Sequence, residues 1–281
     1  MSVVKYILGI LCVASYVFSF RILGIITVPS ISHQVPFRKI WTELSQRGHE
    51  VVVITTDPMK NPQLTNLTEI DLHNSYDVLN TKYNFSNIVT EETNNPFTMM
   101  NIFIKMFEDI VKVQFEHLEI QKLIQDKEQH FDLVMVEVSQ LSFYAFKHKF
   151  RCPVIGLLSM DATPQVYEWM GNPINPVANP DFMLPFAGKL SFVERLLSVL
   201  NRLLLSTYAY PRILLSHDEM IRKNFGEYPS VLDLILSTDM LFLNVHPALQ
   251  GVRPLVPSIV DIGGGLHLQP LKPLPKVCTL Q

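Results

Sequence analysis

The sequence feature that most constrains the fold is a strand–helix–strand pattern in residues 24–55, GIITVPSISHQVPFRKIWTELSQRGHEVVVIT. An apolar strand is predicted over 21–28 and an amphipathic helix over 32–47, followed by the almost wholly apolar strand HEVVVITT. The helix has its apolar side chains on one face, at spacings of three and four: Phe37, Ile40, Trp41 and Leu44. Apolar strands of this kind are typical of a parallel sheet that is covered on both faces.

The same alternation of strands and helices continues along the chain. Further strands are predicted at 69–78, 131–138, 153–159 and 239–245. Further helices are predicted at 96–127, 140–149 and 190–225, the last of which is interrupted at Pro211. This order of elements predicts an α/β fold with a Rossmann-like, doubly wound parallel sheet. In such sheets, ligands bind beyond the carboxyl ends of the strands.

The composition bounds the class of protein. The chain has 281 residues, of which 48% are hydrophobic and 17% are charged, and its mean hydropathy is +0.20. This length and composition suffice for one large domain or two small ones around a well-buried core. The net charge of -3 gives no electrostatic basis for binding nucleic acid, which calls for a basic domain.

Residues 1–19 follow the pattern of a secretory signal peptide. Lys5 precedes an apolar run over 6–17, and Ser19 is a small residue suited to cleavage. The alternative is an uncleaved anchor helix, although the run is short for crossing a bilayer. Two sequons, which begin at Asn66 and Asn84, fit a secretory route as glycosylation sites. We therefore expect the endoplasmic reticulum lumen as the destination of the chain.

Other motifs exclude several kinds of site. Cys12, Cys152 and Cys278 form no disulfide framework or metal site, and Cys152 is expected to be a buried, inert thiol. The histidines lack the H-E-x-x-H spacing of zinc sites, and the chain has no G-x-S-x-G elbow. The glycines of residues 262–270 lead into a proline-rich segment and not into a helix, so they predict a tight turn and no phosphate loop.

Two polar residues lie where a ligand site is expected. His33 follows the first strand, and Glu137 lies in the strand-to-helix junction after Val136. A neutral imidazole is suited to accept a proton near neutral pH, and a carboxylate on its other nitrogen would fix the tautomer. One interpretation is therefore that His33 is a base and that Glu137 orients it. A helix-cap histidine and a carboxylate in a structural salt bridge are the alternatives, and position alone leaves them open.

Four ordered segments resemble the N-terminal half of animal UDP-glycosyltransferases, the UDP-glucuronosyl- and UDP-glucosyltransferases, and most closely the insect-type members. The segments are VPSISHQVPFRKIWTELSQRGHEVVVIT, FDLVMVEV, MGNPINPVANP and LFLNVHPALQGVRPLVPSIVDIGGGLHLQPLKPLP. Together they run through nearly the whole chain after the predicted signal peptide.

The resemblance implies the N-terminal acceptor domain, here residues 20–268, of a two-domain GT-B glycosyltransferase. Such an enzyme transfers a hexose, with inversion, from a UDP-sugar to a hydroxyl of a small lipophilic acceptor, as in detoxification. His33, in its Ser-His-Gln context, matches the catalytic base of the family. Glu137 stands where the family has the aspartate that orients this base, and is one methylene longer. The resemblance implies no cofactor, because the UDP-sugar is a co-substrate that the other domain binds.

The resemblance stops at Pro275 and Lys276, so residues 269–281 are expected to be the start of an interdomain linker and a truncated tail. The nucleotide-sugar signature and the C-terminal membrane helix of the family do not follow. We expect this chain to be inactive alone and to contact membranes only weakly. An alternative is an inactive acceptor-binding or regulatory module that pairs with full-length relatives. A hydrolase that uses the same histidine–carboxylate pair is a third interpretation, which lacks a nucleophile motif.

Overall fold

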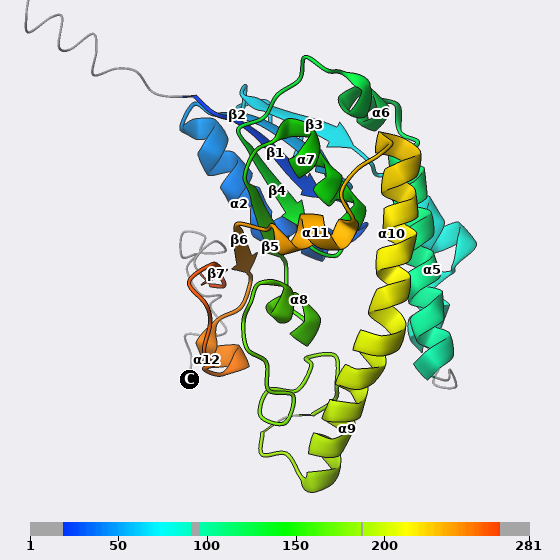
Figure 1. Ribbon diagram of the computed structural model, residues 1–281. Helices are drawn as coiled ribbons and strands as arrows, with labels where there is room; N and C mark the ends of the chain where they lie inside the picture. The colour runs from blue at the N-terminus through cyan, green and yellow to red at the C-terminus, as the bar shows by residue number, and fades with distance from the viewer. Residues whose placement is uncertain (1–18, 91–95, 187, 265–281) are drawn as a thin grey trace, which may run out of the picture.

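A parallel sheet forms the centre of the structure, a computed structural model that describes residues 19–90, 96–186 and 188–264 (Figure 1). Its strands lie in the order β3-β2-β1-β4-β5-β6-β7, and every adjacent pair is parallel. The strands are β1 Arg21–Ile26, β2 Glu50–Thr55, β3 Leu67–Asp71, β4 Leu133–Glu137, β5 Val154–Leu158, β6 Met240–Leu243 and β7 Ile259–Asp261. The order reverses between β1 and β4, so the sheet is doubly wound and the predicted Rossmann-like fold is confirmed.

Helices cover both faces of this sheet (Figure 1). Helix α2 lies on one face, and α5, α7, α10 and α11 pack on the other. The α-helices are α2 Ile31–Gln46, α3 Ser75–Asp77, α4 Phe85–Thr90, α5 Pro96–Phe115, α6 Leu118–Gln125, α7 Ala145–Phe150, α8 Pro164–Trp169, α9 Phe192–Leu204, α10 Tyr210–Phe225, α11 Val231–Leu236 and α12 Pro247–Gln250. Two π turns, η1 Val78–Lys82 and η3 Leu205–Ala209, and the 3-10 turn η2 Leu141–Tyr144 complete the elements.

Each face of the sheet has its own core, because successive side chains of a strand point to opposite faces. Ile26 of β1 lies in a cluster with Trp41 of α2, whereas Leu23 of the same strand lies in the cluster that contains Phe115 of α5. Gly24 faces Trp41, and a Cβ atom built on it would lie 2.8 Å from the ring atom Cη2. The glycine therefore lets the indole pack directly on the backbone of β1.

Strand β3 is shorter than predicted, and the second half of the predicted strand over 69–78 is helical. The strand ends at Asp71, which pairs with Thr55, the last residue of β2. In the described sheet β3 is an edge strand, and its neighbour β2 stops there, so residues beyond Asp71 have no strand of this sheet to pair with. They turn instead into α3 and the π turn η1.

Two long predicted helices are interrupted. The helix predicted over 96–127 breaks into α5 and α6 at His117, whose backbone is extended and whose side chain accepts a hydrogen bond from the Glu119 N–H. The interruption predicted at Pro211 takes the form of the π turn η3 directly before α10, since proline lacks the N–H that would continue the α-helical ladder. Pro36 lies in the second turn of α2, because the helix begins at Ile31.

The glycine-rich segment after β7 approaches the end of β6. The N–H of Gly263 donates to the carbonyl oxygen of Val245 at 3.1 Å, and a Cβ atom on Gly263 would overlap that carbonyl group. Gly264 has a φ angle of 82°, which favours glycine. The first glycines of the predicted turn therefore have a packing role, while residues 265–270 lie outside the described part of the chain.

Candidate active site

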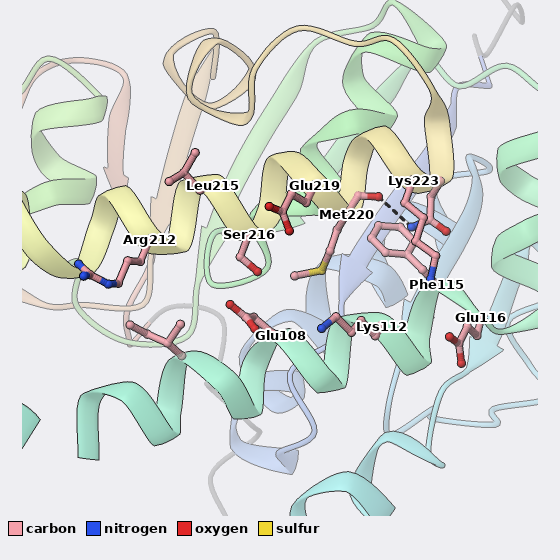
Figure 2. Close-up of a pocket in the computed structure, with 12 residues that line it drawn as sticks. Glu108, Lys112, Phe115, Glu116, Arg212, Leu215, Ser216, Glu219, Met220 and Lys223 are labelled. Carbon is pink, nitrogen blue, oxygen red and sulfur yellow. Dashed lines mark hydrogen bonds between the residues drawn. The ribbon is translucent and has the colours of Figure 1, made fainter. Parts of the chain in front are cut away.

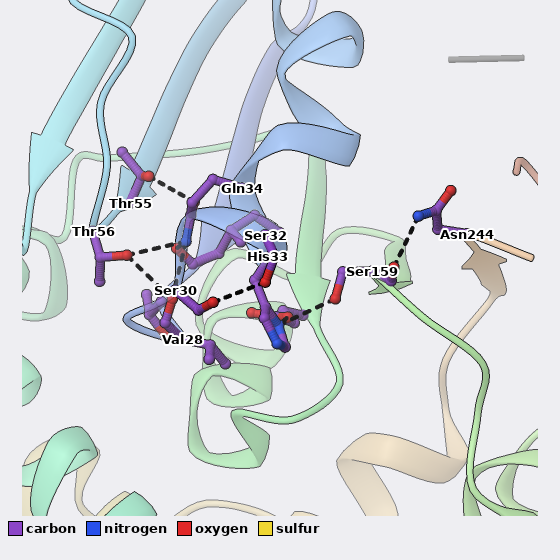
Figure 3. A network of polar contacts seen from close by, with 12 residues as sticks. Val28, Ser30, Ser32, His33, Gln34, Thr55, Thr56, Ser159 and Asn244 are labelled. Atoms are coloured by element: carbon purple, nitrogen blue, oxygen red, sulfur yellow. Dashed lines mark hydrogen bonds and ion pairs between the residues drawn. The ribbon is translucent and has the colours of Figure 1, made fainter. Parts of the chain in front are cut away.

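His33 lies at the N-terminal turn of α2, just beyond the carboxyl end of β1, as the sequence predicted. Its backbone N–H donates to the carbonyl oxygen of Ser30 at 3.0 Å, which begins the helix. Ser30 occupies the N-cap position, but its hydroxyl pairs with the hydroxyl of Ser32 at 2.8 Å and does not cap the helix (Figure 3). The first turn of α2 is therefore held to the sheet by other contacts.

Gln34 supplies these contacts (Figure 3). Its buried amide nitrogen lies 3.1 Å from the carbonyl oxygens of Ile26 and Val28 and 3.1 Å from the hydroxyl of Thr56. Its amide oxygen accepts from the Thr55 hydroxyl at 2.7 Å. The side chain that follows His33 thus ties the start of α2 to the ends of β1 and β2, which fixes the backbone from which the imidazole projects.

Glu137 is the last residue of β4 and is fully buried. The neighbouring residue Val136 pairs with Ile25 of β1, so the carboxylate lies beside the end of β1 and under the first turn of α2. Its Oε1 atom is hydrogen-bonded to Nδ1 of His33. The longer glutamate therefore reaches the imidazole, and the structure brings together the two residues that the sequence singled out. The second oxygen, Oε2, has no hydrogen-bond partner among the described residues.

Ser159 and Asn244 extend this contact to the next two strands, and sequence reasoning missed both. The Oγ atom of Ser159, directly after β5, lies 3.2 Å from Nδ1 of His33. Asn244, directly after β6, donates through Nδ2 to the carbonyl oxygen of Ser159 at 2.8 Å (Figure 3). A signal was present, because each is a polar residue that follows an apolar strand, as His33 and Glu137 do.

The local charges determine the protonation of His33. Burial lowers the pKa of the imidazole, but the hydrogen bond to Glu137 and the charge of its carboxylate outweigh burial, so the pKa is raised above its ordinary value of 6.5. Both hydrogen-bond neighbours lie at Nδ1. With its proton on Nδ1, the neutral ring presents the lone pair of Nε2 as a base. The imidazole is 17% exposed, which leaves it accessible from solution.

The remaining candidate residues lie away from this site. The two sequon asparagines, Asn66 and Asn84, are exposed, and Asn84 has a φ angle of 45°; their glycosylation stays a prediction. Cys152 is buried without a disulfide, and burial raises the pKa of its thiol to about 11, which agrees with an inert role. The predicted signal peptide, apart from Ser19, and the predicted linker over 269–281 lie outside the described residues.

A groove of about 450 Å³ lies between α5 and α10, and does not include His33 (Figure 2). Acidic and basic side chains alternate along it: Glu108, Lys112, Glu116, Arg212, Glu219 and Lys223. Such balanced charge favours neither an anionic nucleotide nor an apolar acceptor. We therefore place the candidate active site at the carboxyl ends of β1, β4, β5 and β6, and not in this groove.

The comparisons with known proteins agree with the resemblance found in the sequence. The family model described as UDP-glucoronosyl and UDP-glucosyl transferase matches residues 24–280. UDP-glucosyltransferase 2 of Dactylopius coccus is 29% identical over 262 residues, which are 91% of this chain and 49% of the relative. UDP-glucuronosyltransferase 2B7 of Rattus norvegicus is 25% identical over 259 residues, which are 87% of this chain and 49% of the relative.

Solved structures of similar proteins include the glycosyltransferase SnogD from Streptomyces nogalater. That structure is 16% identical, with a TM-score of 0.45 over 92% of this chain and 55% of that one. The chain spans about half the length of the curated relatives it matches. Because the family model covers nearly all of the sequence, the chain belongs to the family of UDP-glucuronosyl- and UDP-glucosyltransferases.

Proposed function

We propose that this chain is the acceptor-binding part of a UDP-glycosyltransferase, in which His33 is the catalytic base and Glu137 orients it. The observation that carries the proposal is the hydrogen bond between the buried carboxylate of Glu137 and Nδ1 of His33, in a chain of this family. Both contacts of the imidazole lie at Nδ1, and among the described residues Nε2 has no hydrogen-bond partner, so this nitrogen is available as a base. The arrangement does what general base catalysis requires.

The proposed step is one displacement at the anomeric carbon of the sugar. Nε2 of His33 accepts the proton of the acceptor hydroxyl, and the hydroxyl oxygen forms a bond to the anomeric carbon as the bond from that carbon to the UDP oxygen breaks. UDP leaves with the bonding electron pair, and the configuration inverts. The imidazolium that forms is stabilised by Glu137 through Nδ1.

We propose a small lipophilic molecule with a hydroxyl group as the acceptor and a hexose from a UDP-sugar as the transferred group. Family membership supports the UDP-sugar. The acceptor class, a role in detoxification and a location in the endoplasmic reticulum lumen are parts of the proposal that rest on the sequence. Because transfer depends on the positioning of both substrates, we expect the UDP-sugar contacts of the longer relatives to be needed for turnover.

Complementation tests the proposal. The full chain would be assayed with UDP-glucose and a panel of phenolic acceptors, alone and after addition of a separately expressed C-terminal half of a related UDP-glucosyltransferase. We expect transfer in the mixture and its loss in His33→Ala. A matched control is His49→Ala, which removes a partly exposed histidine in the turn after the other end of α2.

The outcomes of this assay distinguish an enzymatic role of the chain from a regulatory one. Transfer in the mixture that survives His33→Ala would refute the assigned base. No transfer in any mixture, combined with reduced activity of full-length relatives on adding the chain, would refute an enzymatic role and establish the regulatory alternative. Transfer by the chain alone would refute the expected need for the second half.

A further inference from the structure

Three buried polar atoms at the end of β4 have no hydrogen-bond partner in the part of the chain that the structure describes. Glu137 uses Oε1 for the imidazole of His33, and its Oε2 is one of the three atoms. The other two are Nε2 and Oε1 of Gln140, three residues later. Glu137 and Gln140 are both fully buried. Because buried polar side-chain atoms are hydrogen-bonded with few exceptions, three unpaired atoms within four residues point to a bound ligand.

The backbone of this segment, in contrast, is held by hydrogen bonds. The N–H of Val138 donates to the carbonyl oxygen of Leu157 at 3.0 Å, and the N–H of Gln140 donates to the carbonyl oxygen of Glu137 at 3.1 Å, which closes a turn. The carbonyl oxygen of Gln140 accepts from the Phe143 N–H at 3.1 Å, where η2 begins. A turn of this kind keeps its first and fourth Cα atoms within about 7 Å. The side chains of Glu137 and Gln140 therefore start close together from a fixed backbone.

The carboxylate of Glu137 is the more demanding of the two groups. Burying a charged carboxylate costs free energy unless its oxygens are hydrogen-bonded, and each of the two oxygens is an acceptor. The charge of Glu137 is one of the causes that raise the pKa of His33, so the site contains this charge. The imidazole satisfies only one oxygen. A donor for Oε2 is therefore required, and no described side chain or backbone group contacts this atom directly.

The three unpaired atoms together specify the chemistry of the ligand. Oε2 of Glu137 and Oε1 of Gln140 accept hydrogen bonds, whereas Nε2 of Gln140 donates them. A cation would satisfy the two oxygens and leave the N–H groups unpaired, and an anion would be repelled by the carboxylate. Water both donates and accepts. Buried waters in proteins typically make about three hydrogen bonds to polar groups of this kind.

We propose that a buried water molecule binds between the side chains of Glu137 and Gln140. The water donates a hydrogen bond to Oε2 of Glu137 and accepts one from Nε2 of Gln140. It thereby fixes the second oxygen of the carboxylate whose first oxygen faces His33. The proposal concerns the interior of the folded chain, so it does not depend on glycosyl transfer.

NMR cross-relaxation between water and the Gln140 amide tests the proposal directly. The full chain is labelled with ¹⁵N in its glutamine side chains, and the Gln140 resonance is assigned by its loss in Gln140→Met. Water held in the interior gives a nuclear Overhauser effect of opposite sign to that of fast-exchanging surface water. We expect the interior sign at Gln140. The matched control is Gln121, whose Nε2 donates directly to Phe115 and Asn224 and is expected to show no interior water.

A relay through a neighbouring hydroxyl proton has to be excluded in this measurement. Ser139 precedes Gln140 and is partly buried, and its hydroxyl proton exchanges with water. The measurement is therefore repeated in Ser139→Ala, in which we expect the signal at Gln140 to persist. Loss of the signal in this variant would overturn the proposal, because the hydroxyl and not a bound water would be its source.

The stability of Gln140→Met tests the energetics, because methionine has a similar length and lacks the amide. If water is bound, the variant removes one of its partners and weakens the hydrogen bond to Oε2. We then expect the equilibrium constant of unfolding, measured with urea, to rise at least tenfold. If the site is dry, the variant removes two unpaired atoms, and the constant falls. The control is Gln46→Met, at an exposed glutamine that ends α2, and is expected to leave the constant unchanged.

Either measurement can overturn the proposal. Absence of the interior signal at Gln140 would do so whatever the stability of the variant, because a direct contact between Gln140 and Glu137 or a dry site would then account for the interior. A Gln140→Met variant that is as stable as the parent, or more stable, would do so as well. Neither measurement uses a UDP-sugar or an acceptor, so these results are independent of the complementation assay.

Discussion

The position of His33 is fixed by contacts at the carboxyl ends of four adjacent strands, β1, β4, β5 and β6, and each contact has a different effect. Gln34 holds the backbone, Glu137 supplies the charge, and Ser159 lies beside the same ring nitrogen with its own carbonyl held by Asn244. The imidazole thus has two neighbours at Nδ1. The positive end of the α2 dipole disfavours the protonated ring, whereas the negative charge of Glu137 favours it.

Glu137→Gln tests the electrostatic role of the carboxylate. The amide oxygen can still accept from Nδ1–H, but the negative charge is gone, so we expect the pKa of His33 to fall from its raised value. The measurement is a titration of the His33 ring by NMR. Glu43→Gln, an exposed position on the same helix, is the control. An unchanged His33 pKa in Glu137→Gln would show that Glu137 does not tune the imidazole.

At the scale of elements, the close approach of α2 to β1 depends on one missing side chain. Gly24→Ala would place a methyl group 2.8 Å from the indole of Trp41, a buried ring with little freedom to move. We expect the variant to lower the free energy of unfolding by about 1–3 kcal/mol, measured by urea denaturation. If stability were unchanged, α2 would be free to shift, and the placement of His33 would be less rigid than the contacts indicate.

The strand–helix–strand elements were predictable from the sequence, and so were the positions of His33 and Glu137, because a buried parallel strand has an unmistakable apolar pattern. The contact of Ser159 with Nδ1 of His33 was not predicted, although the position of Ser159 directly after an apolar strand was a signal. The exposure of the apolar side chains of α9 was not predicted either, because apolar periodicity identifies an apolar face but not whether that face is buried. The end of β3 was missed because an edge strand stops where its neighbour stops.

At the scale of the whole molecule, stability depends on pH through histidines of opposite character. Burial lowers the pKa of His217 to about 4, so this ring stays neutral in the core, with Nδ1 2.6 Å from the Ser142 hydroxyl. The unfolded chain takes up this proton below its ordinary value of 6.5, and the contribution of His217 is lost as the pH falls from there toward about 4. The raised pKa of His33 acts oppositely, since its contribution is fully present below 6.5 and is lost as the pH rises through the raised value.

The double variant Ser142→Ala with His217→Leu isolates the first effect. It removes both hydrogen-bonding groups together, so neither is left unpaired in the core. We expect the loss of stability between 6.5 and about 4 to be smaller in the variant than in the parent, as measured by urea denaturation across that window. His33 is present in both proteins and cancels in the difference. Equal slopes would mean that His217 is protonated in the folded state.

The strand order also has a consequence for biosynthesis. Strands β1, β2 and β3 are neighbours in both sequence and space. Strand β4 also lies beside β1, but it comes much later in the sequence, and its Glu137 follows His33 by 104 residues. At a translation rate of about 5–20 residues per second, roughly 5–20 s separate the emergence of the imidazole from that of its carboxylate. The histidine–glutamate pair can therefore form only after β4 has been synthesised. A ribosome that stalls between α2 and β4 leaves a nascent chain with the histidine and no counter-charge for it.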